Sequence, residues 1–486
     1  MLFNSFEFLI FFPVVTVLYF LLPHRHRWWW LLLASCVFYM AFIPAYILIL
    51  LLTIVIDYGA GIFIENAQGR QRRFYLALSL AANLGVLAVF KYYNFFIGNM
   101  NGLLHLSNPA ASLPLLGLVL PIGLSFHTFQ AMSYTIEVYR GRYPAERHFG
   151  IYALYVLFYP QLVAGPIERP QHMLPQFHEE KHFDYPRVVS GLRLMAWGLF
   201  KKVVIADRLA YLVNEVYNQP RHFQGLPLLV ATVFFSIQIY CDFSGYSDMA
   251  LGAARVMGFE LRQNFDRPYF ATSIAEFWRR WHMSLSGWFR DYLYLPLGGS
   301  RVALPRACFN LFFVFVVSGL WHGANWTFLA WGALHGAYLV VGKLTQKSRS
   351  QLIEQLGLRF LNHPWLNLAF TYALVTFAWI FFRANGLHDA VYIITHLLKP
   401  AAAVWHEQAF TGWYTVRVLY PFPQWMTLLL AVPLLFLVEK AQRHVSLNAW
   451  LGQQAAPVRW AIYYGIVLSI ALLGAYENIR FIYFQF

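Results

Sequence analysis

The residue in this chain best suited to proton chemistry is His322, which lies inside a long apolar run. The stretch from Leu311 to Val341 contains no Lys, Arg, Asp or Glu, so His322 and His335 are its only groups that titrate near neutral pH. An imidazole at membrane depth is costly to desolvate, and such residues commonly serve proton transfer. His322 is therefore a candidate base.

A metal shared by the two histidines is not expected. His335 follows His322 by thirteen residues, which is about 220° around a regular helix, so the rings would point to nearly opposite sides unless the helix breaks at Gly323. We predict that His335 is a structural, hydrogen-bonded histidine. Asn325 would share the face of His322 and could orient the ring or a substrate. The three cysteines stand singly without a C-x-x-C pair, so no metal site is predicted.

A second candidate region, 255–306, holds eight arginines, four acidic residues and no lysine, interleaved with aromatic residues. Ser273 and Glu276 form a capping box, which predicts a helix that begins at Ile274. Aromatic residues follow at spacings of three and four, and His282 lies on the same face as Trp278. The arginines could contact lipid headgroups or the phosphates of a nucleotide-bearing donor, and both interpretations stay open. The candidate substrate-binding residues here are Trp278, Arg279, Arg280 and Trp281, and Trp321 beside His322 is a further candidate.

A polar segment, YCDFSGYSD (240–248), follows an apolar run. Asp242 and Asp248 would lie about 240° apart on a helix, and Ser244 with Gly245 suggests a helix break. Carboxylates this close to membrane depth should find cationic partners. Asp242 and Ser244 are added to the candidate substrate-binding residues, with these candidate partners for the carboxylates: Arg255, Arg262, Arg279 and Arg280.

The elements that must position these residues are membrane helices. The 486-residue chain is 59% hydrophobic and 12% charged, whereas a soluble domain carries roughly 25% charged residues. We predict an all-α, polytopic membrane protein that forms a single domain over 1–486, with its catalytic centre in 240–342. Some apolar runs are too short to span, so about eleven transmembrane helices plus re-entrant or interfacial helices are expected. The runs are 5–22, 28–43, 46–64, 74–97, 115–138, 150–165, 188–206, 226–241, 307–321, 323–342, 366–382, 422–438 and 458–475.

The distribution of the net charge of +14 predicts the topology. Loops after the first, third and fifth runs contain arginines, while the intervening loops contain no Lys or Arg. The positive-inside rule then places the N-terminus on the outer side of the membrane. The first run lacks the charged start and cleavage site of a signal peptide, so we interpret it as a retained span. No module for nucleic acid is indicated.

Several motifs resemble the membrane-bound O-acyltransferase family, more narrowly its bacterial alginate and peptidoglycan O-acetylation branch. They are Trp321-His322-Gly323, EFWRRWHMSLS (276–286) and YCDFSGYSDMA (240–250). Shorter motifs extend the likeness over nearly the whole chain: FKYYN (90–94), LPIGLSF (120–126), AGP (164–166) and IAD (205–207). Cys241 and Met283 are mild departures, and neither is a residue of the predicted chemistry.

The resemblance implies that His322 is the catalytic histidine and His282 the second active-site histidine. It also implies helices around a central funnel or tunnel in the inner membrane, with no bound cofactor. An acetyl group would leave a cytoplasmic thioester donor, acetyl-CoA, for an acceptor on the outer side. Members of this branch work with extracytoplasmic, SGNH or esterase-like acetyltransferases and with a polysaccharide acceptor.

The chemistry of the residues agrees with that expectation. A histidine in a dry pocket stays neutral and can accept the proton of an attacking hydroxyl, while His282 or Asn325 orients the acceptor or the thioester carbonyl. No G-x-S-x-G nucleophile motif is present, which favours direct transfer over a serine acyl-enzyme, and a transient acetyl-histidine stays open. The alternatives are a transporter of intact substrate, a scaffold for outer enzymes, and transfer to a lipid or protein. The identity of the polysaccharide is not readable from the residues.

Overall fold

The computed structural model describes residues 1–108, 111–163, 165–357, 360, 363–399, 422–476 and 481–482. Within these ranges the protein is helical and has no strand, which confirms the predicted all-α fold. Ala164, in the AGP motif, lies outside them. Of the described helical segments, seven are long and apolar enough to cross a membrane: Pro44–Asn66, Gly69–Ser107, Leu226–Met257, Leu304–His322, Pro364–Arg383, Gln424–Ala441 and Ala456–Leu473.

The chain divides into two compact units, Met1–Met195 with Tyr246–Gln263, and Ala196–Gly245 with Asn264–Phe486. The first contains α1 (Phe6–Leu21), α2 (His24–Met40), α3 (Ile47–Asn66), α4 (Gly69–Leu87), α5 (Tyr93–Ser107), α6 (Leu124–Tyr139), α7 (Phe149–Leu157), α8 (Tyr159–Leu162) and α9 (Pro170–His178). Two helices have residues in both units, α10 (Tyr185–Phe200) and α12 (Leu226–Met257). The second contains α11 (Asp207–Asn218), α13 (Ile274–Arg280), α14 (Met283–Phe289), α15 (Leu304–His322), α16 (Trp326–Gln355), α17 (Pro364–Arg383), α18 (Leu387–His396), α20 (Phe422–Ala441), α21 (Leu447–Gln453) and α22 (Ala456–Leu473).

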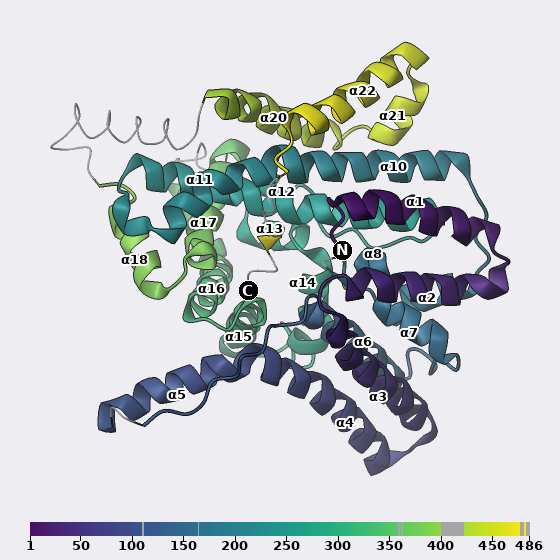
Figure 1. Ribbon diagram of the computed structural model, residues 1–486. Helices are drawn as coiled ribbons and strands as arrows, with labels where there is room; N and C mark the ends of the chain where they lie inside the picture. Colours follow the sequence, from purple (N-terminus) through teal and green to yellow (C-terminus); the bar gives the residue numbers. More distant parts are fainter. Residues whose placement is uncertain are drawn as a thin grey trace. The chain divides into compact units, whose positions relative to one another are not determined.

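In the first unit, buried polar side chains join α3, α4 and α6, which lie together in Figure 1. The carboxylate of Asp57 accepts hydrogen bonds from Ser79 Oγ at 2.6 Å and from Asn83 Nδ2 at 2.8 and 2.9 Å. Ser79 Oγ also lies 3.0 Å from Thr135 Oγ1 on α6. Polar side chains of this kind hold helices together where the surroundings supply no water.

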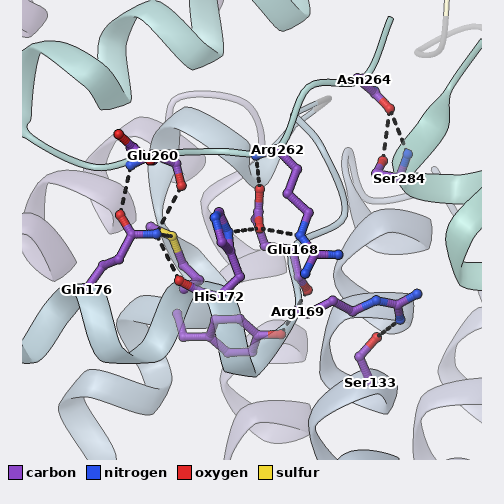
Figure 2. A network of polar contacts seen from close by, with 11 residues as sticks. Ser133, Glu168, Arg169, His172, Gln176, Glu260, Arg262, Asn264 and Ser284 are labelled. Carbon is purple, nitrogen blue, oxygen red and sulfur yellow. Dashed lines mark hydrogen bonds and ion pairs between the residues drawn. The ribbon is translucent and has the colours of Figure 1, made fainter. Parts of the chain in front are cut away.

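The loop after α12 is held within the first unit by two side chains (Figure 2). The buried carboxylate of Glu168 accepts the backbone N–H of Arg262 at 2.6 Å and hydrogen-bonds His172 Nδ1 at 2.8 Å. The amide of Gln176 pairs with both backbone groups of Glu260, at 2.8 and 3.0 Å. The loop therefore leaves the first unit along a fixed path.

In the second unit, α15 and α16 form a closely packed helical hairpin (Figure 1). A Cβ atom on Gly319 would lie 2.2 Å from the carbonyl oxygen of Phe328, and one on Gly332 would lie 2.3 Å from that of Phe315. Such contacts are possible only without side chains, so the glycines permit the backbones to approach. α15 ends at His322 because Gly323 is extended and Asn325 caps the next helix.

Two expectations about helix continuity were wrong. α12 runs without interruption through Ser244 and Gly245, where a break was expected. The expected single helix after Ile274 instead stops at Arg280 and starts again at Met283. His282 between them has φ 45° and ψ 53°, a left-handed conformation that ends the first helix.

One short apolar run is broken, as the sequence analysis allowed, and one longer run gives a shorter helix than expected. The run at 150–165 is broken, as α7 and α8 with a junction at Phe158. The helix expected over 115–138 begins only at Leu124, because Pro121 precedes it and Gly123 has φ 78°.

The capping box is confirmed at Ser273, whose Oγ accepts the N–H of Glu276 at 3.2 Å.

Candidate active site

The two histidines named from the sequence lie side by side in the second unit. His322 is the last residue of α15, and His282 forms the junction between α13 and α14. Their ring centroids are 6.4 Å apart, and the side chains are almost fully buried, at 0% exposure for His282 and 4% for His322. The helix break that the sequence did not reveal is the feature that presents His282 at this place.

Aromatic rings surround the pair. Trp321 and Trp331 each lie 5.0 Å from the ring of His322, and Phe382 lies 5.3 Å from it. The ring of Phe243, from α12, contacts His282 edge-on at 4.7 Å. This lining has a low dielectric constant, which disfavours a charged imidazole and strengthens any hydrogen bond formed inside it.

Asn264 fixes the proton position of His282. Its Oδ1 lies 3.1 Å from His282 Nδ1 and accepts from the hydroxyl and backbone N–H of Ser284, at 2.9 and 3.3 Å (Figure 2 draws Asn264 with Ser284). A backbone N–H can only donate, so the amide must present its oxygen here and His282 Nδ1 must carry a hydrogen. The basic lone pair of His282 is therefore on Nε2. Burial lowers the pKa of His282 to about 3, so the ring is neutral at pH 7.

The sequence did not identify Asn264. It is a single asparagine in a loop, buried to 1% exposure. Nothing in its spacing relates it to His282, eighteen residues later, because the loop path makes the contact. A buried Asn would be recognised only once that path is known.

His335 is the structural histidine that was predicted. Its Nδ1 accepts the indole N–H of Trp278 at 3.2 Å, and its ring contacts Trp331 at 5.0 Å. The helix does break at Gly323, the exception to the regular-helix argument, so His322 and His335 are on different helices, with Trp331 packed against both. Among the described residues, no group of three His, Cys, Asp or Glu could hold a metal ion.

Asn325 is not on the helical face of His322, which corrects the expectation. It is the N-cap of α16, where its Oδ1 accepts the N–H of Thr327 at 3.0 Å. Its amide nitrogen donates to the carbonyl of Asn385 at 3.3 Å. Asn325 is thus a helix cap, and a direct role toward substrate stays a prediction.

Asp242 and Ser244 belong to a buried cluster with two lysines. The expectation that arginines would be the partners of the carboxylate was wrong. Lys202 Nζ contacts Asp242 Oδ1 at 2.7 Å and Asp207 Oδ1 at 2.6 Å. Lys201 Nζ donates to Ser244 Oγ at 2.9 Å. Asp242 Oδ2 also accepts the backbone N–H of Ile482 at 2.8 Å. The neighbouring Phe243 contacts His282, so this cluster supports the site from α12.

The remaining candidates separate into core and surface. Trp281 is fully buried against Phe277 and Trp379, at 5.4 and 5.1 Å, and Trp321 lies against both catalytic candidates. Arg280 is bound to Glu276 at 2.6 Å. Arg279 is exposed and lines a cavity of about 550 Å³, which Trp278 also lines.

These features define a class of protein: a helical membrane protein with a dry, buried pair of histidines, one of them held neutral. The sequence profile of the membrane-bound O-acyltransferase family matches residues 116–385, which include both histidines. The chain belongs to this family, and it is an acyltransferase. The resemblance seen in the motifs is thereby confirmed.

Curated relatives agree with this assignment. The chain is 39% identical to the "Probable alginate O-acetylase AlgI" of Pseudomonas aeruginosa over 80% of this chain and 73% of that protein. It is 32% identical to the "Peptidoglycan O-acetyltransferase" of Helicobacter pylori over 93% of this chain and 90% of that protein. It is 30% identical to the "Teichoic acid D-alanyltransferase" of Streptococcus thermophilus over 45% of this chain and 56% of that protein.

Proposed function

We propose that the protein is a membrane-embedded O-acetyltransferase that modifies a cell-surface polysaccharide, alginate or peptidoglycan. The donor is a cytoplasmic thioester, acetyl-CoA, and the acetyl group passes through a funnel or tunnel across the inner membrane. The relatives named for alginate and peptidoglycan acetylation support the acceptor class. The observation that carries the proposal is the buried pair of His282 and His322, 6.4 Å apart in an aromatic lining.

In this mechanism a hydroxyl oxygen attacks the carbonyl carbon of the thioester. His322 takes the hydroxyl proton as the new C–O bond forms, and the C–S bond then breaks. The sulfur leaves as a thiolate, which regains a proton from His322, so the histidine ends the cycle neutral. Burial at 4% exposure keeps water from competing with the acceptor hydroxyl.

The geometry of His282 supports one of its two possible roles, the orientation of the acceptor hydroxyl, over the polarisation of the thioester carbonyl. Its Nδ1–H is directed to Asn264 Oδ1, and its Nε2 can only accept a hydrogen bond while the ring is neutral. A thioester carbonyl needs a donor, so neutral His282 does not polarise it. His282 orients the acceptor by accepting its hydroxyl hydrogen.

The indole N–H of Trp331 is suited to donate a hydrogen bond to the carbonyl oxygen of the thioester. Trp331 is fully buried 5.0 Å from the ring of His322, and within the described ranges its Nε1 has no hydrogen-bond acceptor. A buried donor of this kind stabilises negative charge more strongly than one in water. Trp331 thus completes a set of base, orienting group and donor.

The proposal includes a partner protein and an orientation of the chain in the membrane. An extracytoplasmic SGNH or esterase-like acetyltransferase completes transfer to the polysaccharide, and the N-terminus lies in the periplasm. The alternation of basic and non-basic loops supports that orientation. Membrane lipids are the other expected partners.

The test is donor cleavage by the purified full-length protein in liposomes, measured as release of coenzyme A thiol from acetyl-CoA with an acceptor oligosaccharide. We expect His322→Gln to lower the rate by about 10²- to 10⁴-fold, since it removes the general base. His182→Gln, at an exposed loop position, is the control and keeps the wild-type rate. A folded His322→Gln protein with full thiol release would refute the mechanism, and passage of intact substrate without thiol release would identify a transporter.

The acceptor is tested separately in cells. O-acetyl groups on each surface glycan are quantified by mass analysis with and without the protein. We expect loss of acetyl groups from one glycan. Unchanged acetyl content on every glycan would contradict the polysaccharide assignment.

A further inference from the structure

The cavity of about 550 Å³ in the second unit is separate from the histidine pair and has no role in the mechanism above. Its volume is in the range of sites that hold small ligands, about 300–1,000 Å³. α14 forms one wall, with Met283, Leu285 and Phe289, and α15 forms another. Arg279 and Arg290 also line the cavity and are exposed, so the cavity combines apolar walls with a cationic rim.

The α15 wall continues into a lipid-facing surface. Leu311, Val314, Phe315 and Ser318 line the cavity and follow the spacing of one helix face. The neighbouring Phe309 and Phe312 are 53% and 38% exposed. Because α15 is long and apolar enough to span a membrane, these exposed rings face hydrocarbon. The cavity therefore lies beside acyl chains of the bilayer.

The rim carries cationic groups able to meet an anion. Arg279 is exposed and forms no hydrogen bond or ion pair with the described residues. Arg290 pairs with Asp291 through Nε at 2.8 Å, and its two terminal nitrogens form no hydrogen bond or ion pair with the described part of the chain. A guanidinium suits a phosphate because its N–H groups form parallel hydrogen bonds.

We propose that this cavity binds an anionic phospholipid, with one acyl chain against the walls of α14 and α15 and the headgroup phosphate at Arg279 and Arg290. The rim belongs to the basic segment 255–306, and Arg301 and Arg306 flank the start of α15. Basic residues at the end of a membrane helix mark the side whose leaflet carries anionic lipids. The cationic rim and the apolar walls of the cavity thus both fit an anionic phospholipid.

The bound lipid has one structural consequence for the site. Trp278 lines the cavity and donates its N–H to His335, whose ring contacts Trp331 beside His322. An acyl chain in the cavity covers the part of Trp278 that lines it. The lipid therefore supports the outer layer of packing around the histidine pair.

The experiment counts lipids bound to purified, delipidated full-length protein by native mass spectrometry. Dioleoyl phosphatidylglycerol and dioleoyl phosphatidylcholine are titrated in parallel. For the double variant Arg279→Gln/Arg290→Gln we expect phosphatidylglycerol binding to weaken roughly thirtyfold, the effect of two basic residues at an anionic surface, with phosphatidylcholine unchanged. Arg349→Gln, at an exposed position on α16, is the matched control and binds both lipids as wild type.

Gly287→Leu separates the cavity from a general attraction to positive charge. Gly287 lines the cavity, and a Cβ atom placed there meets nothing within 4 Å, so a leucine side chain can begin there without a clash and take up part of the space. We expect this variant to lose binding of both lipids while keeping both arginines. Phosphatidylglycerol binding at wild-type strength in either variant overturns the proposal. Displacement of bound phosphatidylglycerol by coenzyme A also overturns it, because the cavity would then belong to the donor.

Discussion

At the scale of single residues, the site depends on which nitrogen of His282 carries the hydrogen. Asn264 decides this because its oxygen already accepts the N–H of Ser284. A histidine in the wrong tautomer presents a donor where an acceptor is needed. In the proposed mechanism Asn264 is thus a positioning residue, which acts on the reaction through His282.

Asn264→Ala is expected to lower kcat by roughly tenfold to a hundredfold, because the His282 ring loses its orientation. KM for acetyl-CoA should change less than kcat, since Asn264 is placed to orient the acceptor group and not the donor. Asn264→Asp keeps an acceptor oxygen and should recover part of kcat. Steady-state kinetics of the purified proteins checks this, and equal kcat values for wild type and Asn264→Ala would contradict the assignment.

The sequence predicted the histidines but not the residue that orients one of them. His322 could be named because its apolar surroundings carry no charged residue, and His282 because its motif resembles that of the family. Asp242 and Ser244 were named, but arginines were proposed as the partners of the acidic residue, whereas Lys202 binds Asp242. Partners that are distant in the chain depend on the path of the fold, which residue spacing does not encode.

At the scale of helices, glycines serve close packing more than flexibility. Gly245 suggested a break, yet α12 continues through it. A Cβ there would lie 2.7 Å from the carbonyl oxygen of Gly198, so this glycine permits a close backbone approach. The break at His282 was missed because the aromatic spacing of three and four continues across it. Periodicity reports which faces are apolar and does not reveal where a backbone turns.

The α15–α16 hairpin gives a direct test of close packing. Gly319→Ala places a methyl group 2.2 Å from the backbone oxygen of Phe328, which cannot move without shifting the helix. We expect it to destabilise the protein by about 1–3 kcal/mol, as overpacking does. The measurement is the apparent Tm in detergent.

Gly342→Ala is the matched control for the hairpin. It lies on α16, and its added methyl group meets nothing within 4 Å. Alanine favours a helix over glycine by about 1 kcal/mol, so the Tm should stay equal or rise. Equal Tm changes for the two variants would show that the approach of the helices is not tight.

At the scale of the whole molecule, the membrane class could be predicted because it depends on composition and the length of apolar runs. The low charge content and long runs agree with the seven membrane-competent helices among the described segments. The arrangement of helices was less accessible, since it depends on glycine contacts and buried polar bonds such as those of Asp57. Composition therefore predicts that the protein lies in a membrane, whereas specific contacts determine how its helices pack.

The fold should become less stable in acid because of His282. Burial lowers its folded pKa from an ordinary value of 6.5 to about 3, so the unfolded chain binds a proton more readily. This contribution to stability is complete above about pH 6.5 and is lost as pH falls toward 3. The facing titratable group is His322, and the other neighbours are Phe243, Trp321 and Asn264.

The measurement is the apparent Tm between pH 7 and pH 4. The wild type should lose stability over this interval, and His282→Gln should show a shallower decline because it has no imidazole to protonate. His182→Gln, at an exposed loop position, should follow the wild-type curve. Parallel curves for wild type and His282→Gln would exclude this origin of acid sensitivity.

The positive φ of His282 has an evolutionary consequence. A side chain with a Cβ in the left-handed region costs of order 1–3 kcal/mol, and asparagine or glycine would occupy the position with less strain. Random substitution screened only for a well-folded chain should therefore drift away from histidine here. The backbone conformation at this position disfavours histidine. If histidine is nevertheless retained among descendants, selection must act on the imidazole and not on backbone stability.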